Sequence, residues 1–357
     1  MSRPVGAPLA APTRRAASTP HAAPKVTIII PTYQRAHLIG LTLQSALNQT
    51  YSDYEILVID DGSTDNTADV VRSIAPKARY IAQANVGIPE VLNVCVREAR
   101  GEYISFLGSD DALAPSALAK EAAILDSNPK VGLVHSAAWL MDEAGRLTQL
   151  LRPSFARGSY VRPGYAEIAD LLMSNHIVAT TVMVRRACFD ECGFFDRRFG
   201  LYEDWNMWTR IFKRWDAAYV DEPLAFYRVH GGEAGSIFRK ANPHDLARYR
   251  RMQLDDILAD PDVGPSYAHL RRRALARHYY TVALQSFDSG DRMYGLWNAA
   301  RSLASRPTRA AAWLFAKNLA PTFALNAARH LKRNERAAQP NAMTIDAILR
   351  GAAVPEA

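Results

Sequence analysis

Short apolar runs alternate with amphipathic stretches over the first third of the chain. Four runs rich in β-branched or aromatic residues predict buried strands, at residues 26–30, 56–59, 79–83 and 103–107. Between them, apolar residues at helical spacing predict helices over residues 36–48, 64–74 and 89–99. Strands that alternate with helices at this interval predict a parallel α/β sheet covered by helices on both faces.

The pattern becomes less regular after Pro129. Short strands are predicted at residues 131–135, 180–184 and 217–220, and a helix at about 203–213. From His244 to about Arg336 the sequence is helical and rich in Ala and Arg, and residues 280–307 resemble one helix–turn–helix unit of tetratricopeptide type. We therefore divide the chain into a disordered N-terminal segment (1–24), an α/β domain (25–238), a helical basic region (239–340) and a frayed tail (341–357).

Composition places the chain among globular proteins and bears on its compartment. Its 357 residues are 48% hydrophobic and 22% charged, which allows a sizeable core. No apolar run approaches the roughly 18 residues of a membrane span. The Ala- and Pro-rich N-terminus lacks the apolar core of a signal peptide, and three scattered cysteines suit a reducing compartment. We expect a cytoplasmic protein.

The positive charge is concentrated near the C-terminus. The whole chain carries +7, whereas residues 271–336 contain 13 Lys and Arg against 3 Asp and Glu, a local balance of +10. Two interpretations stay open: peripheral contact with an anionic membrane on its cytoplasmic face, or a helical cap that makes an oligomer contact. A nucleic-acid partner is not expected, because no base-stacking aromatics or reading motif accompany the charge.

Two pairs of carboxylates each follow a predicted strand, Asp60 with Asp61 and Asp110 with Asp111. The carboxyl ends of parallel strands share one edge of a sheet, so the four acids are expected to converge, although each pair alone would also suit a turn. Adjacent acids repel each other unless a cation holds them, and oxygen ligands favour Mg²⁺ or Mn²⁺. The chain has no P-loop and no dinucleotide fingerprint, so we predict a diphosphate held by metal and acids.

Four segments in the expected order resemble the family 2 glycosyltransferases: residues 26–33, 58–67, 101–111 and 193–210. The resemblance covers about residues 25–236. It implies a GT-A fold, the Rossmann-like mixed sheet of nucleotide-diphospho-sugar transferases, with the C-terminal helices as an extension. It also implies an inverting transferase that moves a sugar from a nucleotide-diphosphate donor to a hydroxyl of a saccharide or lipid-linked saccharide, in surface polysaccharide or glycolipid assembly.

The resemblance assigns roles to individual residues. It implies that Pro31, Tyr33 and Asp61 hold the nucleotide base and that Asp110 lies near the ribose and diphosphate. It implies that Asp111 and His230 hold Mn²⁺ or Mg²⁺. Asp204 would be the general base that accepts the proton of the acceptor. An ionised Asp61 can only accept a hydrogen bond, which suits the N3–H of uracil or thymine and disfavours cytosine. This favours UDP- or dTDP-sugars over CDP-linked donors and does not exclude guanine; of these we expect a UDP-sugar.

Three positions leave alternatives. Leu92 stands where the family often has an arginine before an asparagine, here Asn93. Asn175 and His176 could face the acceptor or form a plain polar loop.

The alternative function is a non-catalytic nucleotide-sugar-binding or scaffold protein on the same fold. The four acids, together with Glu203 and Asp204, argue against it. A nucleotidyltransferase would need a Gly- and Lys- or Arg-rich loop after the first strand, and residues 34–37 do not form one.

Overall fold

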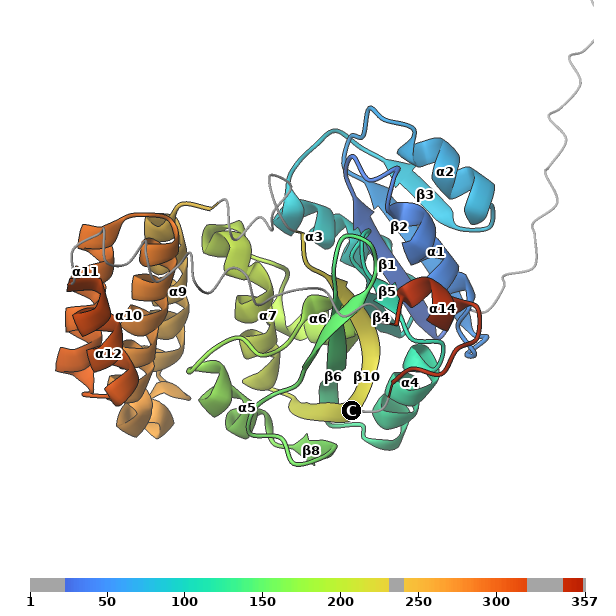
Figure 1. The fold of residues 1–357 in the computed structure, drawn as a ribbon. Coiled ribbons are helices and arrows are strands. Elements are labelled where there is room, and N and C mark those ends of the chain that lie inside the picture. The colour runs from blue at the N-terminus through green and yellow to red at the C-terminus, as the bar shows by residue number, and fades with distance from the viewer. Residues whose placement is uncertain (1–22, 231–240, 320–342, 356–357) are drawn as a thin grey trace, which may run out of the picture.

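The computed structural model describes residues 23–230, 241–319 and 343–355 (Figure 1). The predicted disordered segment 1–24 therefore lies almost wholly outside the described residues. The described residues form one mixed α/β body, to which a group of C-terminal helices is attached.

A single ten-stranded sheet forms the centre of the molecule. Its strands are β1 (Val26–Thr32), β2 (Tyr54–Asp60), β3 (Arg79–Ala82), β4 (Tyr103–Phe106), β5 (Ala112–Leu113), β6 (Val131–Met141), β7 (Leu147–Leu151), β8 (Tyr160–Arg162), β9 (Met183–Arg185) and β10 (Asp216–Arg228). The main path runs β3-β2-β1-β4-β9-β6-β10-β5, with β7 paired to β6 and β8 to β10.

The sheet is mixed. Strands β1, β2, β3 and β4 pair in parallel, as the strand–helix alternation predicts. Strand β9 then runs antiparallel to both β4 and β6, and β10 returns parallel to β6. The carboxyl ends of β1, β2 and β4 therefore lie along one edge, where the predicted acids are found.

Helices cover both faces of the sheet. They are α1 (Ile39–Leu47), α2 (Thr67–Ile74), α3 (Ile88–Glu98), α4 (Ala117–Ser127), α5 (Gly164–Leu171), α6 (Ala187–Cys192) and α7 (Glu203–Phe212), with 3₁₀ turns η1 (Ala179–Thr181) and η2 (Arg197–Tyr202). Strand β1 shows why two layers form. Ile28 and Ile30 pack toward α1, α2 and α4, whereas Ile29 between them packs toward α3 and α7.

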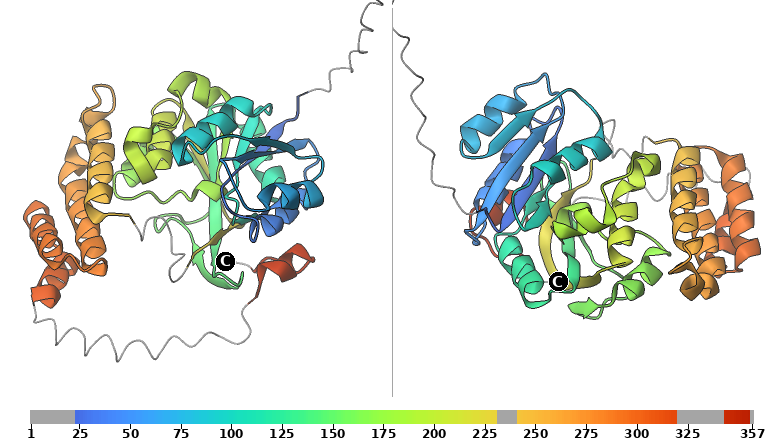
Figure 2. Two further views of the ribbon diagram at one scale, coloured as in Figure 1. Left: turned by 90° about the horizontal axis from the view of Figure 1, so that it is seen from above. Right: turned by 180° about the vertical axis from the view of Figure 1, so that it is seen from behind.

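The C-terminal helices stand beside the α7 side of the sheet, as both views of Figure 2 show. They are α9 (Pro243–Leu258), the 3₁₀ turn η4 (Gly264–Leu270), α10 (Arg271–Asp288), α11 (Arg292–Ser305) and α12 (Arg309–Leu319). Helices α10 and α11 form the predicted helix–turn–helix, and Asp291 caps α11 by accepting from the N–H of Tyr294. Residues 320–342, which include Phe323 and Leu325 of the basic region, lie outside the described residues.

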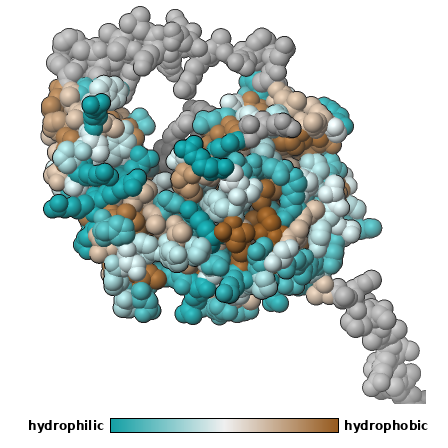
Figure 3. Space-filling model, turned by 90° about the horizontal axis from the view of Figure 1, so that it is seen from below, coloured by the Kyte–Doolittle hydropathy of each residue, from teal (hydrophilic) through white to brown (hydrophobic). Residues whose placement is uncertain are grey.

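The face that Figure 3 shows is largely hydrophilic, with an apolar patch near its middle and further apolar side chains toward its edges. Within the described ranges, no helix is long and apolar enough to cross a bilayer.

The expected frayed tail is wrong for residues 343–355. Thr344 forms a β-bridge with Arg146, and α14 (Ile345–Leu349) follows it beside α1 (Figure 1). Ile345 and Ile348 are each 1% exposed within the core beneath α1 and α4. Their short apolar pattern was too brief to predict a helix from the sequence, and the contact partners lie some 300 residues earlier.

This docking predicts a stability cost. Ile348→Ala deletes a fully buried side chain, so we expect the free energy of unfolding to fall by about 2–5 kcal/mol. Arg350→Gln, on the exposed end of the same segment, should change it by less than about 0.5 kcal/mol. Urea denaturation followed by circular dichroism measures both. Equal, negligible effects of the two substitutions would show that the segment does not dock.

Candidate active site

The first carboxylate pair lies where β2 ends. Asp60 closes the turn, because its Oδ1 accepts from the N–H of Ser63 at 2.8 Å and its Oδ2 from the Tyr80 hydroxyl. The turn interpretation therefore holds for Asp60, and its neighbour Asp61 faces a different loop.

Asp61 organises the loop that leads into α3. Its carboxylate accepts from the Gln83 side chain at 2.8 Å and from the backbone N–H groups of Val86 at 2.9 Å and Gly87 at 3.0 Å. The residue is only 4% exposed. These three donors fix its orientation. Because a carboxylate can accept more than three hydrogen bonds, Asp61 can still accept one from a ligand.

Pro31 and Tyr33 lie at the end of β1 on the same edge. Pro31 is half-buried, and the Tyr33 ring is 47% exposed. The next residue, Gln34, has a φ of +54°, a left-handed conformation that is uncommon for a side chain of this kind. Its backbone N–H donates to the Ser63 hydroxyl, and its side chain accepts from the N–H groups of Thr64 and Asp65. The loop after β2 thus holds the turn that presents Tyr33.

Asp111 is enclosed by the chain's own donors. Its Oδ1 accepts from the N–H of Arg228 at 2.8 Å, its Oδ2 accepts from the Thr180 hydroxyl, and the residue is 3% exposed. Burial, with a contribution from neighbouring Asp110, raises the pKa of Asp111 to about 7. Each oxygen of the expected metal ligand thus accepts one hydrogen bond from the chain itself.

Asp110 points the other way. Its Oδ2 lies 2.7 Å from Nε2 of His230 and 3.8 Å from Nε of Arg35, and its side chain is 22% exposed. The resemblance implies a metal at Asp111 and a ribose contact at Asp110; in the structure Asp110 is the more exposed of the two acids, and it lies beside His230. Asp110 and His230 are the pair that face outward together.

Arg228 fastens the two acids in these positions. Its N–H holds Asp111, its Nε donates to the carbonyl of Asp110 at 2.8 Å, and its guanidinium donates to the carbonyls of Asp142 at 3.0 Å and Glu143 at 2.9 Å. A Cβ at Gly108 would lie 2.7 Å from Asp111 Oδ2, so the turn before the acids has room for glycine alone.

Asp204 lies in the first turn of α7, next to Glu203. Its Oδ1 accepts from the N–H of Trp205, and its Oδ2 from the Asn175 amide at 3.2 Å. Burial raises the pKa of Asp204 to about 6. Burial and the Asp204 charge raise the pKa of Glu203 to about 8, and Glu203 Oε2 has no partner among the described residues. At neutral pH the pair therefore favours an ionised Asp204 beside a protonated Glu203.

Tyr227 of β10 lies close enough to Asp110, Asp111 and Asp204 for their charges to act on its hydroxyl. Burial raises the pKa of its hydroxyl, and the charges of Asp111, Asp110 and Asp204 raise it further. Tyr227 of β10 therefore lies within electrostatic range of the acids that follow β4 and of the acid at the start of α7. Asp61 and Tyr33 lie along the same edge at β1 and β2.

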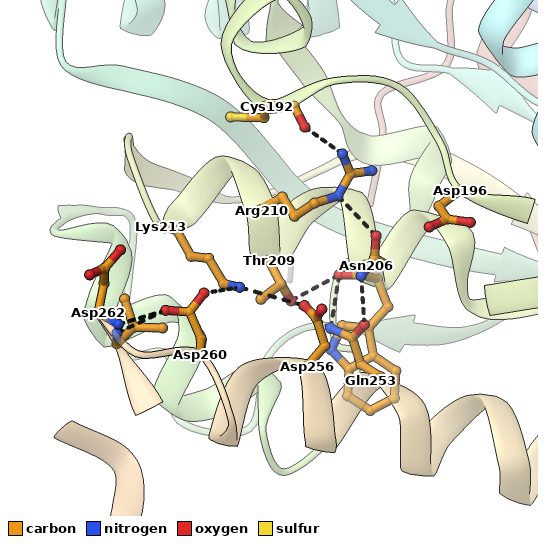
Figure 4. Close-up of polar contacts among 12 residues, drawn as sticks. Cys192, Asp196, Asn206, Thr209, Arg210, Lys213, Gln253, Asp256, Asp260 and Asp262 are labelled. Carbon is orange, nitrogen blue, oxygen red and sulfur yellow. Dashed lines mark hydrogen bonds and ion pairs between the residues drawn. The ribbon is translucent and has the colours of Figure 1, made fainter. Parts of the chain in front are cut away.

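Residues around α7 that the motifs include have supporting roles. Arg210 donates to the Asn206 side chain at 2.9 Å and to the carbonyl of Cys192, as Figure 4 shows. Gln253 of α9 donates to the Thr209 hydroxyl at 2.8 Å in the same view. A cavity of about 430 Å³ opens between Phe194 and Phe199 on this side of α7. The C-terminal helices thus brace the helix that carries Asp204.

Other residues near α7 also have structural roles. Asn93 is buried and exchanges hydrogen bonds with the backbone of Phe195, at 3.0 Å to its carbonyl and 2.8 Å from its N–H. Trp205 and Trp208 are both 0% exposed and pack in the core. Leu92 packs against the same core. Thr180, Arg228 and Tyr227 were missed by sequence reasoning, because no motif spacing marks them.

Comparisons with known proteins agree with this arrangement. The family described as Glycosyl transferase family 2 matches residues 27–193. A PGL/p-HBAD biosynthesis glycosyltransferase of Mycobacterium tuberculosis is 30% identical over 226 residues, which are 61% of this chain and 82% of that relative. The chain belongs to the family 2 glycosyltransferases. An uncharacterized glycosyltransferase of Rickettsia felis is also 30% identical, but the matched region is only 36% of its length.

Solved glycosyltransferase structures share the fold. Residues 1–349 of S. aureus TarS in complex with UDP-GlcNAc superpose with a TM-score of 0.61 at 18% identity, over 83% of this chain and 88% of TarS. The mannosyltransferase PcManGT from Pyrobaculum calidifontis in complex with GDP-Man and Mn²⁺ gives a TM-score of 0.54 at 20% identity, over 94% and 87%. The family 2 chain therefore has the expected GT-A fold with a C-terminal helical extension.

The opposite orientations of the adjacent acids generate a prediction. If Asp110 ligates a divalent ion, Asp110→Asn should abolish any Mn²⁺-dependent gain in UDP affinity without lowering the melting temperature, because Asp110 is partly exposed and accepts no backbone N–H bond from the described residues. Asp111→Asn should instead lower the free energy of unfolding by about 1–3 kcal/mol, because its single oxygen can accept from Arg228 or from Thr180 but its NH₂ cannot accept the other bond. Calorimetry with UDP and thermal melting measure the two effects. If Asp111→Asn alone removes the metal dependence, the ligand is Asp111 after all.

Proposed function

We propose that the protein is an inverting glycosyltransferase that moves a sugar from a UDP-sugar to a hydroxyl acceptor. The observation that carries the proposal is Asp204, a partly enclosed carboxylate with a raised pKa that lies, like Asp110 and Asp111, within electrostatic range of Tyr227. Neighbouring acids with perturbed pKa values are typical of catalytic sites, and this favours an enzyme over a non-catalytic scaffold.

Asp61, Pro31 and Tyr33 form the proposed nucleotide subsite. The exposed Tyr33 ring offers a face for a base to stack on, and Asp61 is held at the same edge by three donors. A carboxylate acceptor favours uracil, whose N3–H donates, over cytosine. TarS, which shares the fold, has been solved with UDP-GlcNAc, and this supports a uridine donor.

Asp110 and His230 fit a divalent ion. Their Oδ2 and Nε2 atoms lie 2.7 Å apart at the edge of the sheet, and both side chains are partly exposed. A carboxylate with an imidazole suits Mn²⁺ better than Mg²⁺, which prefers oxygen alone. A bound ion would neutralise charge on the departing diphosphate. Asp111, with Arg228, keeps Asp110 in place beneath it.

Asp204 acts as the general base in this proposal. It accepts the proton of the acceptor hydroxyl while that oxygen attacks the anomeric carbon from the face opposite the diphosphate. Asn175 holds Oδ2, and the α7 N-terminus stabilises the ionised form. Single displacement inverts the anomeric centre, so an α-linked donor gives a β-linked product.

We also propose a saccharide or lipid-linked saccharide acceptor, as in surface polysaccharide or glycolipid assembly on the cytoplasmic face of a membrane. The basic C-terminal helices support contact with an anionic surface. Trp297 and Trp313 are 54% and 62% exposed there, and Lys317 lies 4.6 Å from the Trp313 ring centroid.

Replacing the base tests the proposal directly. Asp204→Asn keeps the shape but removes the basic oxygen, so turnover should fall roughly 10²–10⁴-fold while donor affinity stays nearly unchanged. Glu203→Gln is the matched control on the same turn and should cost much less. UDP release from a panel of UDP-, dTDP-, GDP- and CDP-sugars, with candidate acceptors, measures both variants. If Asp204→Asn keeps near wild-type turnover, Asp204 is not the general base and serves only as an acid in the first turn of α7.

The raised pKa of Asp204 predicts a pH dependence. The base must be ionised to accept a proton, so the rate should be constant above about pH 6 and fall tenfold per unit below it. Asn175→Ala removes a hydrogen bond that favours the ionised form, so its acid limb should move to higher pH. Initial rates at saturating donor from pH 5 to pH 9 measure the limb. An identical limb in both proteins would contradict the assignment to Asp204.

A further inference from the structure

A second cluster of ligand-type side chains lies away from the nucleotide edge, between β6 and α5. His135 of β6, Glu167 of α5 and His176 of the following loop bring one ligand atom each within 4.8 Å of one another. His135 and Glu167 are fully buried, and His176 is 11% exposed at its side chain. None of the roles assigned above uses this cluster.

His135 has no hydrogen-bond partner among the described residues. Neither of its ring nitrogens is satisfied by any described residue, although the ring is 0% exposed. The approach of Nε2 to Glu167 Oε1, at 3.7 Å, is too long for a hydrogen bond. Leaving a buried polar group unpaired costs about 1–3 kcal/mol. A ligand that bonds to a ring nitrogen of His135 would remove that cost. Burial also lowers the pKa of His135, which keeps the imidazole neutral, the form that binds metals.

Glu167 is oriented as a one-oxygen ligand. Its Oε2 accepts from Nε of Arg162 at 2.6 Å and from the Tyr160 hydroxyl at 3.2 Å. Its Oε1 faces both histidines, 2.6 Å from Nε2 of His176. Partners that hold the second oxygen of a ligating carboxylate are a usual feature of metal sites. The Arg162 charge is shared with Asp170, 2.9 Å away, which reduces its repulsion of a cation.

We propose that His135 Nε2, Glu167 Oε1 and His176 Nε2 bind a Zn²⁺ ion. Zinc bonds of about 2.0–2.2 Å at a tetrahedral centre place neighbouring ligand atoms about 3.3 Å apart. The present separations of 2.6 and 3.7 Å lie on either side of that value, so small rotations of the side chains admit the ion. Two imidazoles and one carboxylate select zinc over Mg²⁺ or Ca²⁺, which prefer oxygen ligands.

The ion would fix the loop that reaches the proposed base. His176 follows Asn175, whose amide donates to Asp204 Oδ2 at 3.2 Å. Two residues earlier, the carbonyl of Met173 accepts from Arg250 at 2.7 Å. Zinc at His176 would secure the loop on the other side of Asn175. With three protein ligands, the fourth position of the tetrahedral zinc would be taken by a water. These ligands are distinct from Asp110 and His230, where the other ion is expected.

Metal content tests the proposal without reference to activity. The full chain, purified without a histidine tag, is stripped with a chelator, reloaded with Zn²⁺ and desalted, and its metal is measured by mass spectrometry. We expect one retained zinc per chain, and a visible d–d absorption band when Co²⁺ replaces it. No retained zinc and no cobalt band in the wild-type chain would overturn the site.

Variants locate the ion. His176→Gln removes the most exposed ligand and should weaken zinc binding at least about 100-fold, because losing a supporting partner alone costs 10–100-fold. Glu167→Gln serves as a second variant, with circular dichroism to confirm its fold. His244→Gln, at an exposed histidine, and Asp110→Asn with His230→Ala should both keep the zinc. Retention by His176→Gln, or loss only in the Asp110 and His230 variant, would overturn the proposal.

Discussion

The candidate site depends on one buried side chain, Arg228 at the end of β10. Its backbone N–H holds Asp111, its Nε holds the carbonyl of Asp110, and its guanidinium donates to the carbonyls of Asp142 and Glu143. The turn after β4, the end of β10 and the turn after β6 are thereby fastened together. Because His230 follows Arg228 by two residues, the same contact brings its ring to Asp110.

Burial then gives neighbouring acids different chemistry. Asp111 is enclosed and its pKa rises to about 7, while Asp110 beside it remains accessible to a ligand. The same division recurs on α7, where Glu203 has a pKa raised to about 8 and Asp204 one raised only to about 6. In each pair the more deeply buried carboxyl favours its protonated form, which spares the pair the cost of two adjacent charges.

Sequence patterns predict what local periodicity and strand ends determine. The strands β1–β4, the helices between them, and the positions of Asp61 and Asp204 all follow from short-range signals. Which of two adjacent aspartates faces the ligand does not follow, because the deciding donors, Thr180 and Arg228, lie 69 and 117 residues from Asp111. The structural role of Asn93 and the docking of α14 could not be predicted for the same reason, since their partners are distant in the chain. The cluster at His135, Glu167 and His176 likewise joins residues with no common motif.

A crystal structure of the chain with UDP and Mn²⁺, with anomalous data collected at the manganese edge, tests the central claim most directly. The account predicts uracil against Tyr33 and Asp61, and an anomalous peak bonded to Asp110 Oδ2 and His230 Nε2, with Asp111 still held by Arg228. A peak bonded to Asp111 instead, or UDP bound away from this edge of the sheet, would contradict it.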